Sequence, residues 1–287
     1  MSLLDPRLQA FTAIVQQGTV QAAARTLAIT QTGVTQRIRA LEAQLSTTLF
    51  TRSRKGMNLT SEGEALHRYC QSIRDLEGLY LNEILGDSSQ TLVRLTLSGP
   101  TSIVSSRIIP TCVDLYREFP NLILNYQLDD RQDSLDLLRK GVVQLAIASP
   151  EEVALEMTSK LLRPDRYVLV CSSRWKGRKT AEVIRNERMI DFYESDTTTK
   201  EYLQKFGLLE QARPDRIYAN TNYALINLIK AGLGYGTLTQ EVAAEDLEKG
   251  DLICLNQKQF LESPLALVWY PRNPMPQYFK KIIQSIK

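Results

Sequence analysis

The sequence of 287 residues has a single histidine, His67, and only four cysteines. Cys70, Cys112, Cys171 and Cys254 form no Cys-x-x-Cys pair and lack the spacing of a zinc finger, so reduced thiols are expected. One histidine excludes a histidine-rich metal site. A Ser-His-Asp or Cys-His catalytic system would have to be built around His67.

Long apolar runs are also missing. No stretch approaches eighteen consecutive apolar residues, so no transmembrane helix is expected. The opening residues, MSLLDPRLQAF, lack the basic segment and long apolar core of a signal peptide. We therefore expect a cytoplasmic protein without a membrane partner. Its length exceeds one usual hydrophobic core and predicts two or three folding units.

The net charge is only +3, but it is unevenly distributed. Residues 1–65 contain seven basic and four acidic residues, and the remainder has 28 of each. A basic end on a neutral body suggests a polyanion partner for that end. A solvated charged face is the ordinary alternative, so the interpretation depends on the pattern of residues within this end.

Three helices are predicted in the basic end. Asp5 and Pro6 suit the start of the first helix, and Gly18 suits its end. Thr19 can cap a short second helix over residues 21–27. Thr30 can cap a third helix that reaches about Leu45.

The third helix has two contrasting faces. Val34, Ile38, Leu41 and Leu45 form an apolar face, and polar residues lie opposite, mostly in the first turns. A recognition helix needs this layout, because its N-terminal turns enter the major groove of DNA. An amphipathic helix with an uncharged polar face is the alternative. The candidate DNA-binding residues are Gln31, Thr32, Thr35, Gln36, Arg37 and Arg39.

A basic hairpin follows this helix. The tight turn over residues 51–56 carries Arg52, Arg54 and Lys55, and residues 57–59 return as a strand. Such a hairpin is well placed to grip phosphate as a wing. Thr60 and Ser61 then cap another helix, with Ser61 and Glu64 at capping-box spacing.

Residues 10–66 closely resemble the winged helix-turn-helix of LysR-type transcriptional regulators. The resemblance includes Ala22-Ala23-Ala24, Ile29-Thr30-Gln31, Gln36-Arg37-Ile38, Leu49-Phe50, Arg52, Leu59-Thr60 and Gly63. One departure is Gly33, where the family usually has a small residue other than glycine. Glycine within a helix costs roughly 1 kcal/mol relative to alanine.

A long helix is predicted from residue 61 to about 85, because apolar residues recur at spacings of three and four. Its exposed apolar stripe should pair with another helix. The resemblance implies a linker helix that joins two subunits antiparallel, while packing on its own domain is the alternative. Residues 86–89 are the candidate hinge.

Strands and helices alternate in the rest of the chain, which predicts an α/β fold with largely parallel sheets. The expected strands are residues 92–98, 122–128, 145–148, 167–172, 189–192, 217–219, 252–254 and 265–269. The expected helices are residues 110–119, 134–140, 198–206 and 221–231. The resemblance implies a periplasmic-binding-protein-like effector domain with two lobes around a ligand cleft.

The predicted division is a DNA-binding domain over residues 1–60, a linker helix and hinge over 61–90, and an effector domain over 91–287. Within the effector domain, lobe I is about 91–162 and 268–287, and lobe II is about 163–267. The chain would cross between the lobes near residues 162–166 and 264–269.

Ligands in open α/β sheets bind beyond the carboxyl ends of the strands, and helix N-termini attract anions. This rule selects a set of polar residues at strand ends. Each of them could instead serve to cap a helix or to form a turn. The candidate effector-binding residues are Thr101, Ser102, Asp130, Ser149, Tyr193, Asp196, Asn220 and Thr221.

The stretches around residues 126–147 and 192–203 resemble the arginine- and lysine-responsive members of the family. A basic amino acid as effector would need an anion hole at Thr101 and Ser102, and a carboxylate such as Asp130 or Asp196 for its ammonium. The glycines of residues 232–236 follow a helix and lack dinucleotide-binding spacing, so they do not indicate a phosphate loop. They resemble the helix-to-strand turn that the family has near the cleft. The Thr-Leu-Thr-Gln sequence after them replaces a proline common in the family.

We therefore predict a ligand-modulated transcriptional regulator that is not an enzyme and needs no cofactor or metal. The expected partners are a double-stranded DNA operator with dyad symmetry, lysine or arginine, and further copies of the chain in a dimer or a tetramer of two dimers. RNA polymerase is another candidate partner. The alternatives are a ligand-independent architectural DNA-binding protein and an α/β enzyme with an appended DNA-binding domain.

Overall fold

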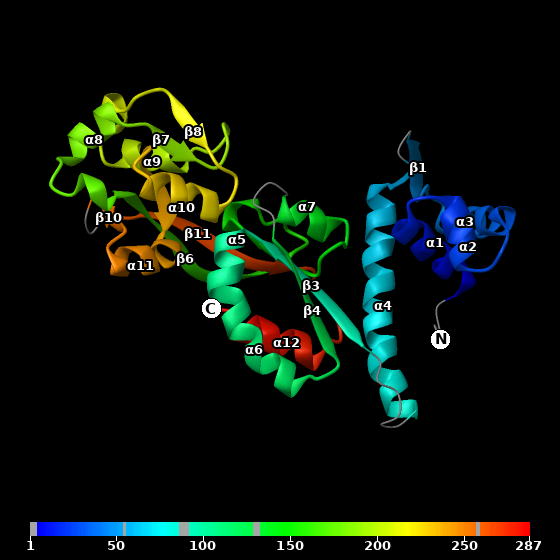
Figure 1. The fold of residues 1–287 in the computed structure, drawn as a ribbon. Coiled ribbons are helices and arrows are strands. Elements are labelled where there is room, and N and C mark those ends of the chain that lie inside the picture. Colours follow the sequence, from blue (N-terminus) through cyan, green and yellow to red (C-terminus); the bar gives the residue numbers. More distant parts are fainter. Residues whose placement is uncertain (1–4, 54–55, 86–91, 129–132, 257–258) are drawn as a thin grey trace.

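The computed structural model describes residues 5–53, 56–85, 92–128, 133–256 and 259–287. A small helical unit lies on one side of a long helix, and a larger α/β unit lies on the other (Figure 1). Four of the sequence predictions lie outside the described residues. They are Arg54, Lys55, Asp130 and the hinge over residues 86–89.

The helical unit has the three predicted helices, α1 (Pro6–Gln17), α2 (Val20–Thr26) and α3 (Gln31–Leu45). Their predicted caps are confirmed. The side chains of Asp5, Thr19 and Thr30 accept hydrogen bonds from backbone N–H groups in the first turns of α1, α2 and α3. Gly18 ends α1 with a φ of +73°, which is a left-handed conformation suited to glycine.

The predicted apolar face of α3 is confirmed for Val34, Ile38 and Leu41, which are buried with Phe11 in the core of the helical unit. The prediction is wrong for Leu45, which is 44% exposed. Leu45 is the last residue of α3, and the helix runs past the edge of the core by that point.

The predicted wing is confirmed as an antiparallel hairpin of β1 (Phe50–Ser53) and β2 (Gly56–Leu59). The helix after it, α4 (Ser61–Leu85), has the predicted length. Its predicted capping box is wrong. Thr60 caps the helix by accepting from the Gly63 amide at 3.0 Å, and the Ser61 hydroxyl donates to Glu62 instead.

The α/β unit is built on a seven-stranded sheet. Six strands follow the order β10-β6-β11-β5-β3-β4, and the seventh, β9, also pairs with β6. Only the β3–β4 and β3–β5 pairs are parallel, so the prediction of largely parallel sheets is wrong. The strands are β3 (Val93–Gly99), β4 (Leu122–Leu128), β5 (Leu145–Ala148), β6 (Thr158–Ser172), β9 (Gly236–Thr239), β10 (Leu252–Cys254) and β11 (Leu261–Trp269). A separate parallel pair is formed by β7 (Met189–Asp191) and β8 (Arg216–Tyr218).

Two long neighbouring strands explain the antiparallel character of the sheet. β6 has fifteen residues, and residues 158–167 of it pair with β11, with a register shift between Ser263 and Leu265. The sequence predicted only the apolar second half of β6. Its first half contains polar, largely exposed residues such as Arg163, so it has no continuous apolar run.

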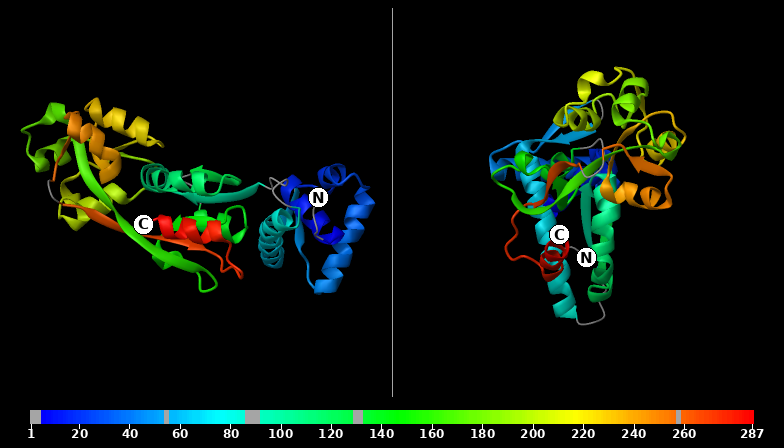
Figure 2. Two further views of the ribbon diagram at one scale, coloured as in Figure 1. Left: turned by 90° about the horizontal axis from the view of Figure 1, so that it is seen from below. Right: turned by 90° about the vertical axis from the view of Figure 1, so that its left-hand side faces the viewer.

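Helices cover both ends of this sheet (Figures 1 and 2). The predicted helices are α6 (Ile109–Glu118), α7 (Ser134–Arg139), α9 (Thr198–Lys205) and α10 (Asn222–Lys230). A short α5 (Thr101–Ile103) and a π-helical turn (Val104–Ile108) lead directly into α6. Three further helices, which were not among those named from the sequence, are α8 (Thr180–Asn186), α11 (Gln240–Lys249) and α12 (Gln277–Ser285).

The hydrophobic core of the α/β unit falls into two groups of clusters. One group surrounds β3, β5 and α12, and the other surrounds the second half of β6 with β7, α9 and α10. We refer to the first group and its helices as lobe I and to the second as lobe II. Because β6 and β11 belong to both lobes, the lobes are joined through the sheet.

Candidate DNA-binding surface and effector cleft

The polar face of α3 is accessible in the structure. Gln31, Thr32, Gln36 and Arg39 are exposed, and Thr35 and Arg37 are half-buried. The Thr35 hydroxyl donates its proton to the Gln31 carbonyl at 2.9 Å, so its methyl group and the lone pairs of its oxygen are left for an outside contact. All six candidate DNA-binding residues of α3 therefore belong to one accessible helix whose other face is anchored in the core.

The wing is attached to the end of α1. The Met57 amide donates to the Gly18 carbonyl at 3.0 Å, and Gly56 has a φ of +126°. A Cβ at Gly56 would lie 2.6 Å from the Gly18 carbonyl oxygen, so this close approach requires glycine. Arg52 is exposed on β1, on the same unit as the recognition helix.

A cavity of about 620 Å³ lies between the two lobes. Lobe I contributes the ends of β3 and β5 and the start of α7, and lobe II contributes the loop after β7, the start of α10 and β9. The polar residues lining it are Ser102, Asp133, Ser134, Ser149, Glu152, Tyr167, Tyr193, Ser195, Asp196, Thr198, Asn222, Thr237 and Thr239.

The cavity brings together four of the candidate effector-binding residues, namely Ser102, Ser149, Tyr193 and Asp196. Thr101, Asn220 and Thr221 do not line it. Thr221 instead caps α10 by accepting from the Ala224 amide at 3.2 Å. The sequence reasoning found the correct strand ends but could not tell which of two neighbouring side chains points into the cavity.

The charge of this cleft has one sign. Asp133, Glu152 and Asp196 line it, and the described lining residues include no arginine, lysine or histidine. Three carboxylates in a cleft attract a positively charged ligand and repel a negatively charged one. Glu152 was missed by the sequence reasoning because it lies in a short 3-10 turn after β5, where nothing in the sequence pattern marks it.

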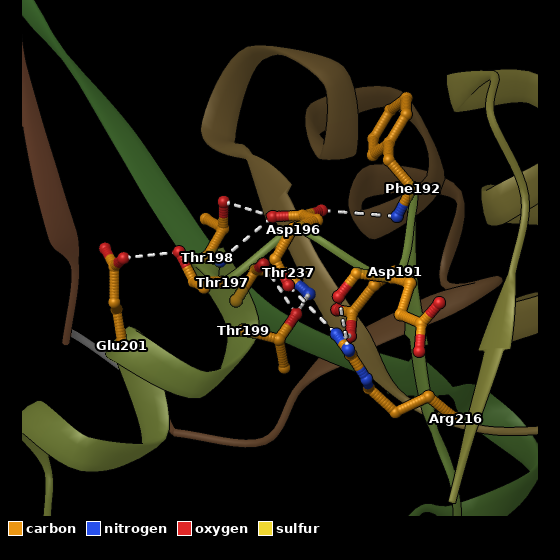
Figure 3. A network of polar contacts seen from close by, with 10 residues as sticks. Asp191, Phe192, Asp196, Thr197, Thr198, Thr199, Glu201, Arg216 and Thr237 are labelled. Carbon is orange, nitrogen blue, oxygen red and sulfur yellow. Dashed lines mark hydrogen bonds and ion pairs between the residues drawn. The ribbon is translucent and has the colours of Figure 1, made fainter. Parts of the chain in front are cut away.

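Asp196 holds the loop that forms one wall of the cleft (Figure 3). One carboxylate oxygen accepts from the Phe192 amide at 3.2 Å, and the other accepts from the amide and hydroxyl of Thr198 at 2.9 and 2.8 Å. These contacts shape the turn before α9, and Asp196 also lines the cavity. Asp196 thus has a structural role even without a ligand.

Arg216 supports the same loop from below (Figure 3). Its guanidinium donates to the Asp191 carboxylate at 3.0 Å and to the backbone carbonyls of Asp196 and Glu194 at 2.9 and 2.5 Å. Burial raises the pKa of Asp191, while hydrogen bonds from Thr199 and Arg216 oppose this rise. The sequence reasoning missed Arg216, because its partners are 20 to 25 residues away along the chain.

Lobe II is further braced by two threonines. The hydroxyls of Thr199 and Thr237 lie 2.9 Å apart in a buried position and connect the start of α9 to β9. Thr237 belongs to the sequence that follows the glycines of residues 232–236. The predicted helix-to-strand turn is confirmed there, since α10 ends at Lys230 and β9 begins at Gly236.

The described residues contain no group of three or more histidine, cysteine, aspartate or glutamate side chains that could hold a metal ion. None of the helices in this part of the chain has the length and apolarity needed to cross a membrane. His67, the one histidine, lies on α4 and does not line the interlobe cavity.

Two family models match the chain. Residues 6–64 match the bacterial regulatory helix-turn-helix protein of the lysR family, and residues 89–287 match the LysR substrate binding domain. A probable HTH-type transcriptional regulator, LtrA of Klebsiella pneumoniae, is 25% identical over 294 residues, which cover 99% of this chain and 94% of that protein.

Solved structures share the whole fold. ArgP from Mycobacterium tuberculosis superimposes with a TM-score of 0.81 at 22% identity and covers 99% of this chain and 96% of its own. Full-length LysG from Corynebacterium glutamicum with bound effector Arg has a TM-score of 0.76 at 19% identity, with the same coverage.

Proposed function

Since the chain belongs to the LysR family of bacterial transcriptional regulators, we propose that a basic amino acid bound in the interlobe cleft controls its binding to DNA. The observation that carries this proposal is the charge of the cleft. Its described lining has three carboxylates and no basic side chain, so a ligand with a net positive charge fits best. LysG, which shares the fold, has arginine as its bound effector.

The two ends of such a ligand would meet different surroundings. Pro100 and Ser102, at the start of the helix that follows β3, line the cavity, and helix N-termini attract anions, so this end of the cleft suits the α-carboxylate. Glu152 and Asp196, on opposite lobes, suit the ammonium or guanidinium groups. A ligand that contacts both lobes favours the closed state, because it binds that state more tightly.

For DNA, α3 would enter the major groove, with Gln31, Thr32, Thr35, Gln36, Arg37 and Arg39 toward bases and nearby phosphates. Arg52, Arg54 and Lys55 of the wing would contact phosphate. The operator would have dyad symmetry, because two protomers would pair through α4 and two such dimers would form a tetramer. As a DNA-binding regulator without catalytic activity, the protein would act in the cytoplasm.

Isothermal titration calorimetry with four amino acids tests the effector. L-arginine and L-lysine should bind, while their neutral analogues L-citrulline and L-norleucine should bind at least about tenfold more weakly, a difference of 1.4 kcal/mol. Glu152→Gln should weaken the binding of the basic amino acids. Glu151→Gln is the matched control, since Glu151 is also exposed but does not line the cavity.

Equal binding of arginine and citrulline would overturn the choice of a basic ligand. The absence of any amino-acid response, combined with intact DNA binding, would favour a ligand-independent architectural protein. Catalytic turnover of a bound compound would contradict the regulator itself.

A further inference from the structure

α4 makes direct polar contacts with the end of α7 in lobe I. The His67 Nδ1 donates to the Lys140 carbonyl at 2.9 Å. Arg68 donates to the Arg139 carbonyl, and the Gln71 side-chain amide donates to the Gly141 carbonyl. These three carbonyls follow one another at the C-terminal end of α7, where helix carbonyls lack partners within the helix.

The fit between the two elements depends on Gly141. It has a φ of +70°, and a Cβ there would lie 3.1 Å from both the Gln71 Oε1 and the His67 Nδ1. The absence of a side chain thus allows α4 to approach the carbonyls closely. His67 is only 6% exposed, and burial lowers its pKa, which favours the neutral ring. Nδ1 carries a proton, because the Lys140 carbonyl can only accept.

The other end of α7 lies at the cleft. Asp133, the N-cap of α7, and Ser134, its first residue, line the cavity. The buried hydroxyls of Ser134 and Ser98 lie 3.0 Å apart and attach this end to β3. Six helical residues span only about 9 Å, so the cleft and α4 are connected by a short rigid element without an intervening loop.

A second element that lines the cleft reaches the same turn of α4. β11 passes the cavity at Leu265 and ends at Trp269. The next residue, Tyr270, lies under the Arg68 guanidinium, 4.2 Å from ring centroid to Cζ. Figure 1 shows α7 facing α4 across the boundary between the two units.

This turn of α4 also belongs to the DNA-binding unit. Leu66 and Cys70 pack in the core that contains α1 and α3, and Cys70 is fully buried. His67, Arg68 and Gln71 point from the same turn toward lobe I. One helical turn is therefore shared by the core that positions the recognition helix and by the two elements that line the cleft.

We infer that the contacts of His67, Arg68 and Gln71 with the end of α7 transmit closure of the cleft to the DNA-binding unit. The inference rests on the proposed function, because it describes how a ligand in the same cleft would change DNA binding. A shift of α7 or β11 on ligand binding changes the tilt of α4, and α4 carries the winged domain with it. Coupling of this kind typically changes affinity by roughly 5- to 150-fold.

The test is the ratio of DNA affinities with and without saturating L-arginine, measured by fluorescence anisotropy on a DNA fragment selected from a random library. The double variant Arg68→Ala/Gln71→Ala should bring this ratio close to one. Its affinity for arginine, measured by calorimetry, should stay within about threefold of wild type, since neither residue lines the interlobe cavity. Gly141→Ala, which acts from the side of lobe I, should have the same effect.

Lys140→Ala is the matched control. It removes the Lys140 ion pair with Asp136 but keeps the backbone carbonyl that His67 binds, so the ratio should stay at the wild-type value. A wild-type ratio in both the double variant and Gly141→Ala would overturn the inference.

A second measurement does not require the effector. Spin labels at Gln21→Cys and Lys280→Cys in a Cys254→Ser background report the distance between the winged domain and lobe I, when labelled chains are diluted with unlabelled protein. The distribution should be narrow with the contacts intact and broader in the double variant. If the wild type binds no basic amino acid, the proposed effector is wrong. Independently of that result, a distance distribution in the double variant as narrow as that of the wild type would overturn the inferred role of the contacts between α4 and α7.

Discussion

Arg216 and Asp191 form an ion pair across 3.0 Å inside lobe II, with side chains that are only 6% and 1% exposed. Two further hydrogen bonds from Arg216 hold the carbonyls of the loop over residues 192–197, which forms a wall of the cleft. The pair therefore links the stability of lobe II to the shape of the ligand site.

Arg216→Met should destabilise the protein by about 3–5 kcal/mol, because it leaves the buried Asp191 carboxylate without its cation. The loop would also lose its support, so effector affinity should fall. Urea unfolding measures the first effect, and calorimetry measures the second. Arg213→Met is the control, since the exposed pair of Arg213 with Asp215 is worth at most about 1 kcal/mol. Equal losses in the two variants would contradict the role of Arg216.

Asp165 predicts a pH dependence of stability. Burial raises its pKa from 3.8 to about 6, Glu241 adds to the rise, and Arg107 opposes it. The folded protein binds the proton of the Asp165 carboxyl more tightly than the unfolded protein does. The contribution of this group to the free energy of unfolding is therefore largest below about pH 4 and is lost as the pH rises through about 6. Asp165→Asn should therefore stabilise the protein at pH 7 by on the order of 3 kcal/mol, and much less at pH 4.

Urea unfolding at several values between pH 4 and 7 checks this expectation. Asp215→Asn is a control of opposite sign, because hydrogen bonds from Arg213 and Arg188 lower the pKa of Asp215. The stability that Asp215 contributes is present at neutral pH and is lost as pH falls through its lowered pKa. Parallel stability curves for wild type and Asp165→Asn would exclude the proposed titration.

The start of α4 depends on a close contact at Gly63. A Cβ at this position would lie 2.2 Å from the Leu49 carbonyl oxygen and 2.9 Å from the Leu59 side chain. Gly63→Ala should thus cost about 1–3 kcal/mol through overpacking and should disturb the wing. At Gly33 a Cβ would lie 3.3 Å from the Thr30 hydroxyl, and Gly33→Ala should change stability by less than about 1 kcal/mol. Thermal unfolding compares the two, and a tolerated Gly63→Ala would contradict the contact.

Local chemistry explains why the helical unit was predictable. Asp5, Gly18 and Thr30 cap helices through contacts within a few residues, so their neighbours in the sequence are their partners in the structure. The wing and the length of α4 follow from similarly local patterns. The capping box of Ser61 failed because Thr60, one residue earlier, is the cap: its hydroxyl accepts from the Gly63 amide and its carbonyl from the Glu64 amide.

The α/β unit was less predictable because its contacts are distant in sequence. Nothing local shows that the exposed half of β6 pairs with β11, whose residues lie about a hundred positions later, so the antiparallel sheet was missed. Arg216 was missed for the same reason. In the cleft, the strand ends were identified correctly, but the sequence does not show which side chain points into the cavity. Ser102 lines it and Thr101 does not.

The proposed DNA contacts lead to two different outcomes. Arg52→Ala should weaken binding to all DNA sequences alike and reduce the slope of log affinity against log salt by about one, because a phosphate contact releases a counterion. Gln36→Ala should instead change the preferred operator, at a cost of about 1–3 kcal/mol for the base pair concerned. Anisotropy over a salt series and selection from a random library measure the two effects. Arg117→Ala, which removes an exposed cation on α6 in lobe I, should leave both unchanged. An unchanged sequence preference in Gln36→Ala would count against the placement of α3 in the major groove.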